Sequence, residues 1–290
     1  MRRPVASAAA LLALLALPAG AHAAAEATAS STGAVPDGAT AGTRTPCPDG
    51  TDAYSGGFWI GGNFDAEHGS ERINALFASG SATTPRWNAN FWNPADGGPE
   101  VTVKGFAYCS RSGPRLRSSS LVYSNLPPGG TFLDTATCDE GFPGGGQFQF
   151  GTLRGEFPFL ITSSYPGGRN WTNGAFNPSE SEPNFGPTVL CGDRRRSRVY
   201  DVRNPVQDGE NVELTGFCNE DGERAVAGGW ELEQGQEDAT DGNVYGSRRT
   251  RNERGWTIGV HNPDDGGGPI DLRTIVACQT PSKGKPGKDD

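Results

Sequence analysis

The sequence predicts an all-β protein built from three diverged copies of one disulfide-stapled repeat. The chain has 290 residues, of which 43 are Gly and 22 are Pro, and only 34% are hydrophobic. This composition favours many short strands joined by turns. Gly or Pro interrupts almost every window of a dozen residues, which the interior of a helix tolerates badly. The third observation is a set of six cysteines within a pattern that recurs three times.

The N-terminus has the three parts of a secretory signal peptide. A basic start, Met1 to Arg3, precedes an apolar run from about Ala8 to Leu17 and then Ala21-His22-Ala23. The run is too short to span a bilayer. Residues 1–23 are therefore predicted as a signal peptide, residues 24–33 and 280–290 as disordered segments, and the mature chain as secreted and extracellular without membrane insertion. The net charge of −9 disfavours nucleic acid as a partner, because phosphate binding needs clustered cations, and leaves an extracellular glycan or protein.

The first anchor of each repeat is a turn followed by a cysteine. A Gly lies nine residues before the Cys in all three copies, and Pro or Asp precedes the Gly. Gly accepts positive φ and Pro or Asp favours the preceding turn position, so the step predicts a turn. The turns are Val35–Gly38, Leu126–Gly129 and Val206–Gly209, and the cysteines are Cys47, Cys138 and Cys218.

The second anchor is a glycine pair before an aromatic residue. It is Gly56-Gly57 before Phe58, Gly145-Gly146 before Phe148, and Gly228-Gly229 before Trp230. Paired glycines inside a strand pattern predict a β-bulge or a place where another backbone comes close.

The third anchor is a Trp followed six residues later by Asn-Pro. Residues two apart in this segment share a face, as in a half-buried strand, so the recurrent Trp is predicted to lie in the core. A loop and a returning strand lead to a second Cys, which gives each repeat about four antiparallel strands. The Trp and Asn residues are Trp87 with Asn93, Trp171 with Asn177, and Trp256 with Asn262, and the repeats span 34–112, 118–192 and 197–279.

Equivalence of the repeats favours one disulfide within each. Six cysteines allow 15 connectivities, and the favoured set is Cys47–Cys109, Cys138–Cys191 and Cys218–Cys278. The rival set, Cys109–Cys138 with Cys191–Cys218, leaves Cys47 and Cys278 to pair end to end. Short linkers between repeats favour one compact body with pseudo-threefold symmetry, like a β-prism. Three tandem small β-sandwiches, each with its own core, are the alternative.

These motifs resemble a family of uncharacterised secreted bacterial proteins. The matching segments are Cys47-Pro-Asp-Gly-Thr51, the glycine pair before Phe58, the strand from Trp87 to Asn93, and Val103-Lys-Gly-Phe-Ala-Tyr-Cys109. The third copy is similar and the second departs most, with Cys138-Asp-Glu-Gly141. The resemblance implies export and a repeat architecture, and it implies no activity. A more distant architectural similarity is to the three-fold β-prism of vitelline membrane outer layer protein, and architecture does not carry function.

Residues for catalysis are few. His68 lies in a polar loop, and His261 replaces Trp92 and Phe176 of the other copies, which predicts a residue on a strand face. The chain lacks a Gly-x-Ser-x-Gly elbow, a phosphate loop and a dinucleotide fingerprint. Without a Cys-x2-Cys pair the cysteines do not match a zinc site. No catalytic residue and no enzymatic activity are predicted.

Two groups of residues are candidates for binding. Trp59 and Trp92 occur in one copy only, so we expect them to face outward. The loops after Asn-Pro carry Asp96, Asp264 and Asp265, and a separate loop carries the weak calcium candidates Asp238, Asp241 and Asn243. None of these matches the EF-hand loop, and turn formation explains Asp-Gly equally well. No resident cofactor is predicted, with Ca²⁺ as the one weak candidate.

The sequence thus predicts a secreted, non-catalytic extracellular or cell-envelope protein with a structural or adhesive role. The alternative is a carbohydrate- or ligand-binding module, with or without Ca²⁺. The recurrent residues account for the scaffold. A specific function therefore has to lie in positions where the copies differ.

Overall fold

The computed structural model describes the chain as β-strands and the turns that join them. The described residues are 27–61, 74–76, 86–93, 99–110, 117–118, 124–151, 160–177, 180, 182, 184–192, 196–233, 242–263 and 266–280. The protein is all-β in this part, as predicted. None of these segments forms a helix long and apolar enough to cross a membrane.

The strands follow the three repeats in order. The first repeat contributes β1 (Ala27–Val35), β2 (Thr40–Pro46), β3 (Asp52–Gly61), β4 (Asn74–Leu76), β5 (Arg86–Trp92) and β6 (Val101–Ser110). The second contributes β7 (Arg117–Ser118), β8 (Ser124–Asn125), β9 (Thr131–Thr137), β10 (Phe142–Gly151), β11 (Leu160–Gly167), β12 (Asn170–Phe176) and β13 (Asn184–Gly192). The third contributes β14 (Arg198–Val206), β15 (Asn211–Phe217), β16 (Arg224–Glu233), β17 (Asn243–Arg249), β18 (Gly255–His261) and β19 (Ile270–Gln279).

The predicted N-terminal boundary is wrong for residues 27–33. These residues form most of β1, which pairs with β6 from Ala27 opposite Cys109 to Val35 opposite Val101. The segment carries mostly small residues, so it lacks the alternation of hydrophobic and polar residues by which a strand is predicted. Backbone pairing with β6 holds it in place. In the same register β14 pairs with β19, from Arg198 opposite Cys278. The first and third repeats therefore have six strands each, rather than about four.

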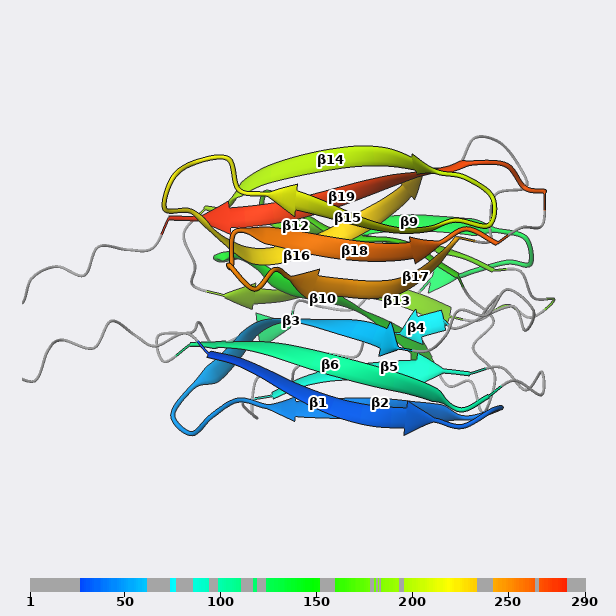
Figure 1. Cartoon of the computed structure of the whole chain (residues 1–290), viewed down its shortest axis with the longest axis horizontal. Coiled ribbons are helices and arrows are strands. Elements are labelled where there is room, and N and C mark those ends of the chain that lie inside the picture. The colour runs from blue at the N-terminus through cyan, green and yellow to red at the C-terminus, as the bar shows by residue number, and fades with distance from the viewer. Residues whose placement is uncertain are drawn as a thin grey trace, which may run out of the picture.

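Each repeat divides its strands between two sheets and shares those sheets with its neighbours. One six-stranded sheet, β1-β6-β3-β17-β18-β15, joins the first repeat to the third, and we call it the 1/3 sheet. The other, β14-β19-β16-β11-β12-β9, joins the third repeat to the second, and we call it the 3/2 sheet. Figure 1 shows β3 of the first repeat beside β17 of the third. The equivalent strands β3, β10 and β16 contact one another in pairs, so the repeats surround a common pseudo-threefold axis.

The predicted bulge occurs in all three repeats. The register between the glycine strand and the closing strand shifts at Ala53/Ser55, Pro143/Gly145 and Ala225/Ala227. The glycine two residues after the extra residue of each bulge lies under the Trp of its own repeat. A Cβ on Gly56, Gly146 or Gly228 would come within 1.9–2.2 Å of an indole ring atom of Trp87, Trp171 or Trp256, respectively. Only glycine allows the Trp to pack this closely on the strand.

The second glycine allows two repeats to join. A Cβ on Gly57 would lie 2.2 Å from the Ser247 carbonyl oxygen, and one on Gly229 would lie 1.8 Å from that of Ser164. These are the crossings from β3 to β17 and from β16 to β11. Gly146 is the equivalent of Gly56, because both lie under the Trp of their own repeat. The residue equivalent to Gly57 in the second repeat is therefore Gln147. The glycine pair predicted for this repeat, Gly145-Gly146, is one residue too early in the chain. Among the described residues β10 is not paired with β4, so the third face consists of two separate sheets.

The core is shared between the repeats, which contradicts the alternative of three tandem sandwiches with separate cores. One cluster of buried side chains includes Phe58 and Phe91 of the first repeat, Trp171 of the second, and Trp230 and Trp256 of the third. The three recurrent Trp residues are at most 4% exposed, as predicted for core positions. The indole nitrogens of Trp171 and Trp256 donate to Ser164 Oγ (3.0 Å) and Ser247 Oγ (2.8 Å), which satisfies these buried donors.

The Asn of each Asn-Pro step holds the predicted turn in place. All three Asn side chains are buried, and Nδ2 of Asn93, Asn177 and Asn262 donates to the carbonyl of Val35, Leu126 and Val206, respectively. Each of those carbonyls begins a turn whose Gly has positive φ: Gly38, Gly129 and Gly209. The disulfides of the structure are Cys47–Cys109, Cys138–Cys191 and Cys218–Cys278, the set that repeat equivalence favours.

Candidate functional site

The structure separates the predicted binding residues. Trp59 is half-buried on β3 in the 1/3 sheet, and Trp92 is half-buried at the end of β5 in another sheet. Asn243 is buried in β17. His261 lies on β18 opposite Asn211, at the position that Trp92 has opposite Thr40, so it is a strand-face residue as predicted. The remaining candidates lie outside the described residues: His68, Asp96, Asp238, Asp241, Asp264 and Asp265.

An open groove of about 770 Å³ crosses the 1/3 sheet where the two repeats meet. Four basic side chains and one acidic side chain line it, together with three aromatic residues and three threonines. We call it the basic groove. Its residues are Thr28, Trp59, Lys104, Phe106, Tyr108, Arg248, Arg249, Thr250, Arg251, Glu253 and Thr257. This concentration of positive charge stands out on a chain with a net charge of −9.

The equivalent face of the 3/2 sheet carries a closed network of ion pairs. Arg273 contacts Asp201 (2.9 Å) and Glu231 (2.7 Å), and Arg203 forms ion pairs with Asp201 and Glu233. Tyr165 adds a hydrogen bond from its hydroxyl to Glu231 (3.2 Å). Charges on this face are therefore neutralised within the sheet itself.

Strand register shows what replaces this network on the 1/3 sheet. Lys104 pairs with Trp59 across β6 and β3, as Arg273 pairs with Glu231 across β19 and β16. Phe106 pairs with Ser30, as Ile275 pairs with Asp201. The two carboxylates that neutralise Arg273 thus correspond to Trp59 and Ser30. Lys104 has no carboxylate within ion-pair distance among the described residues, and its Nζ lies 5.3 Å from the centre of the Phe106 ring.

Trp59 holds a guanidinium group. The Arg248 guanidinium carbon lies 3.8 Å from the centre of the Trp59 ring, and Tyr245 meets the same ring edge-on at 5.1 Å. The ring also packs over Gly246, where a Cβ would lie 2.1 Å from a ring atom. Arg248 reaches the exposed Glu213 at 3.4 Å, a solvent-screened contact. Trp59, one of the two Trp residues that the sequence marks as candidates for binding, therefore positions Arg248.

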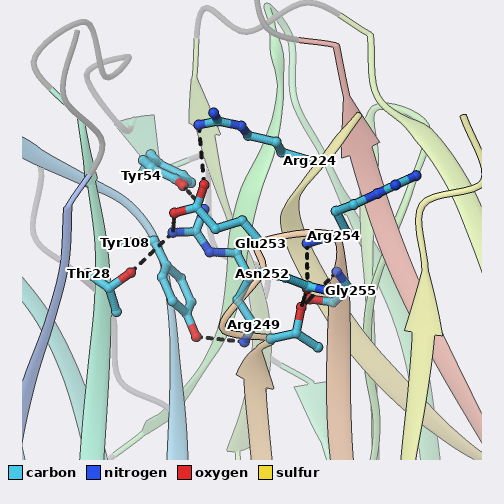
Figure 2. A network of polar contacts seen from close by, with 10 residues as sticks. Thr28, Tyr54, Tyr108, Arg224, Arg249, Asn252, Glu253, Arg254 and Gly255 are labelled. Atoms are coloured by element: carbon cyan, nitrogen blue, oxygen red, sulfur yellow. Dashed lines mark hydrogen bonds and ion pairs between the residues drawn. The ribbon is translucent and has the colours of Figure 1, made fainter. Parts of the chain in front are cut away.

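A buried arginine lines the basic groove and is the centre of the polar network in Figure 2. Arg249 of β17 is 1% exposed and crosses the junction into the first repeat. Its Nη1 donates to the Tyr54 hydroxyl (2.5 Å) and its Nη2 to Thr28 Oγ1 (3.2 Å), and its backbone N–H donates to the Tyr108 hydroxyl (2.6 Å). The guanidinium also lies 4.5 Å from the centre of the Tyr108 ring. These contacts fix the two repeats relative to each other at the groove.

Glu253 completes this network in a conformation that favours glycine. Its φ is +60°, in the turn between β17 and β18. Its carboxylate lies 3.2 Å from both Arg249 and Arg224, as Figure 2 shows. The equivalent residue in the second repeat is Gly168, at φ +64°, and Pro166 stands where the third repeat has Arg249. A non-glycine residue costs about 1–2 kcal/mol in this region, and two ion pairs offset that cost at this junction.

Burial changes the acidity of two tyrosines beside the groove. Desolvation raises the pKa of Tyr108 well above its usual value of 10.0, and the hydrogen bond from the Arg249 backbone partly opposes the shift. Desolvation, with the negative charge of Glu213, raises the pKa of Tyr245 to about 12. Both hydroxyls stay protonated at neutral pH, so Tyr108 and Tyr245 are polar neutral groups and the charge of the groove comes from its basic residues.

Two other clusters do not make a site. Cys218, Glu223 and Cys278 lie close enough to hold a metal, but the two sulfurs are joined to each other in a disulfide. The space on the pseudo-threefold axis, lined by Trp87, Trp171 and Trp230 among others, has a volume of about 10 Å³. That is room for about one water molecule and for no larger ligand.

Sequence reasoning found Trp59 but missed the basic residues of the groove. Lys104 and Arg248 look like ordinary exposed strand residues, because the pattern of one strand says nothing about the acids opposite. A signal was available in the repeats: the Lys104 position is Arg273 in the third copy, while Trp59 corresponds to Glu231. No protein-family model matches the sequence, and no curated protein is significantly similar to it.

Proposed function

We propose that the protein is a non-catalytic extracellular protein that adheres to a ligand through the basic groove. Three disulfides suit an oxidising extracellular environment, where such bonds persist. The observation that carries the proposal is the contrast between the two six-stranded sheets. One neutralises its charges internally, whereas the other presents Lys104 and Arg248 beside aromatic side chains in an open groove.

The size and lining of the groove support binding. A volume of about 770 Å³ lies within the range of sites that hold small ligands or short segments of polymers. The network around Arg249 fixes the groove before any ligand arrives, which reduces the entropy lost on binding. Arg248 and Arg249 lie on β17, which pairs with β18, rather than on a long loop, so this part of the groove is preorganised.

A purely structural role is the second candidate. Each recurrent residue already has a place in the scaffold: the glycines admit a Trp or a neighbouring strand, the Asn side chains hold turns, and the cysteines are bonded. This role accounts for the repeat frame but gives no reason for the loss of both carboxylates around Lys104.

Binding of the purified mature chain to an array of cell-wall and plant glycans, with and without EDTA, separates the two candidates. We expect binding that Lys104→Glu abolishes, with EDTA testing the dependence on Ca²⁺. Tryptophan fluorescence gives a second readout, because a ligand at Arg248 disturbs the ring of Trp59. Absence of binding to every glycan and to whole cell walls would contradict the adhesive role and favour the structural one.

A further inference from the structure

We infer that the ligand of the basic groove is an acidic polysaccharide whose carboxylate groups bind Lys104 and Arg248. This inference rests on the proposed function, because it names the chemical class of the ligand for that same groove. The first argument is electrostatic. Four basic side chains and one acidic side chain line the groove, and the acidic one, Glu253, is paired with the buried Arg249. Lys104, Arg248 and Arg251 are the basic residues of the lining outside that pair.

The exposed Lys104 and the half-buried Arg248 are placed for separate anionic groups on one ligand. Lys104 lies opposite Trp59 on one side, and Arg248 lies on the neighbouring strand on the other side, so β3 separates them. Adjacent strands are about 4.8 Å apart, which puts the two backbones about 10 Å from each other. A polymer with carboxylates at intervals can contact both, whereas a single small anion contacts one.

The chemistry of Arg248 favours a carboxylate. A guanidinium stacked on an indole ring keeps its in-plane N–H donors directed sideways, where they match the two oxygens of a carboxylate. The exposed Glu213 already accepts one long hydrogen bond from Arg248 Nη2, at 3.4 Å. A ligand carboxylate would take the place of this weak surface partner without leaving a buried charge.

The net charge of the chain favours a polymer with sparse charges over nucleic acid. The threonine hydroxyls of the groove are engaged within the protein, with Arg249, Gly255 and Thr215 as partners of Thr28, Thr250 and Thr257, respectively. Double-stranded DNA carries a charge about every 1.7 Å, and a chain with net charge −9 repels such a polymer outside the groove. A polysaccharide with more widely spaced charges meets less of that repulsion.

The test uses the mature chain with its disulfides intact and polygalacturonate as the probe. Fully methyl-esterified polygalacturonate is the matched neutral control, because it has the same sugar backbone without the charge. We expect polygalacturonate to bind at least tenfold more tightly than the ester. We also expect its affinity to fall about threefold or more between 50 mM and 200 mM salt, as for contacts between exposed charges.

Charge variants locate the binding site. Lys104→Glu should weaken binding at least tenfold, whereas Arg44→Glu should not, although it changes the net charge equally. Arg44 is exposed on β2, in a different sheet. Ser30→Asp places an acid at the position equivalent to Asp201 and should also weaken binding, with Ser30→Asn as its uncharged control. Unchanged thermal midpoints would show that these exposed substitutions leave the fold intact.

The outcomes distinguish this inference from the proposed function. Equal binding of the acidic and esterified polymers, or equal loss with Lys104→Glu and Arg44→Glu, overturns the acidic ligand but leaves an adhesive protein. Tighter binding to double-stranded DNA or to phosphatidylserine vesicles than to polygalacturonate also overturns it. Failure to bind any glycan or cell wall overturns both.

Discussion

Single glycines decide how the repeats meet. At Gly57 the missing side chain lets the carbonyl of Ser247 approach to where a Cβ would be, and the same holds for Gly229 with Ser164. At residue 147 the chain has Gln instead, and the strands on that face are not joined among the described residues. The missing side chain at this position in the first and third repeats thus allows the two continuous six-stranded sheets.

Gly57→Ala should destabilise the protein by about 1–3 kcal/mol, because the new methyl group would lie 2.2 Å from the Ser247 oxygen and force β3 and β17 apart. Gly61→Ala on the same strand is the matched control, since its nearest neighbour would be 3.7 Å away. Chemical denaturation measures both variants. Equal stability of the two would contradict the close approach.

Sequence patterns predicted the local residue roles and missed the distant ones. The turn glycines, the bulge and the core Trp residues depend on a few neighbours in the chain, so their spacing announces them. The partner of Gly57 is Ser247, which no local pattern can indicate. For the same reason the sequence pattern did not show that Lys104 lacks the acidic partners of Arg273. That difference follows only from the strand register, which puts Trp59 and Ser30 at the positions of two acids in the third repeat.

At the scale of elements, the turn between β17 and β18 joins the first and third repeats. The hairpin carries Arg249 and Glu253, which have no counterpart in the hairpin of the second repeat, with Pro166 and Gly168. Tyr108 of β6 is buried and receives a hydrogen bond from the backbone of Arg249. The contact is therefore specific to one junction, and desolvation there favours the neutral form of Tyr108.

Stability should consequently fall in alkali. The folded state raises the pKa of Tyr108 through desolvation, so the unfolded chain loses this proton near pH 10 while the folded chain keeps it. The contribution is fully present below about pH 10 and is lost as the pH rises further. Urea unfolding between pH 8 and about pH 10.5 should show this decline, with a shallower slope in Tyr108→Phe.

Tyr245, whose pKa is raised to about 12, should account for part of the slope that the Tyr108→Phe variant keeps. The substitution also removes one hydrogen bond, so its stability at pH 8 is the reference for its own titration. An identical slope in the two proteins would contradict a buried, neutral Tyr108.

β1 is the element that the sequence failed to predict. Ala27–Val35 is poor in large apolar residues, and its exposure alternates between half-buried and exposed until Val35. Its strand conformation comes from hydrogen bonding along the whole length of β6 rather than from its own side chains. A pattern of hydrophobic residues cannot reveal a strand of this kind.

At the scale of the whole molecule, each repeat has its own disulfide, and residues of all three repeats pack together in a large core. Buried residues of all three copies form one large cluster, and a smaller cluster around Trp87 joins the first copy to Leu190 of the second. Each disulfide closes a loop of 53 to 62 residues within one copy. Cross-links within repeats and packing between repeats thus stabilise the same body. The spacing of the cysteines predicted the cross-links within repeats. It did not decide how the repeats pack, because a prism and three separate sandwiches both fitted the sequence.

Unfolding should occur as one transition. Calorimetry of the oxidised chain should give a single peak, because the large buried cluster contains residues of all three repeats and the smaller one also joins two of them. The double substitution Cys47→Ala with Cys109→Ala should lower stability by about 4 kcal/mol in the chain-entropy description and shift that peak as a whole. A separate early transition for the first repeat would contradict the shared core.

The pairing of β3 with β17 has a consequence for how the number of repeats can change in evolution. β3 of the first copy pairs with β17 of the third, and together they make the six-stranded sheet continuous. Neither copy can therefore form this sheet alone. Deleting one copy leaves an unpaired sheet edge, and inserting a fourth displaces the partner that Gly57 accommodates. Adding or removing a whole copy therefore has to break this pairing, whereas substitutions within the three copies leave it in place.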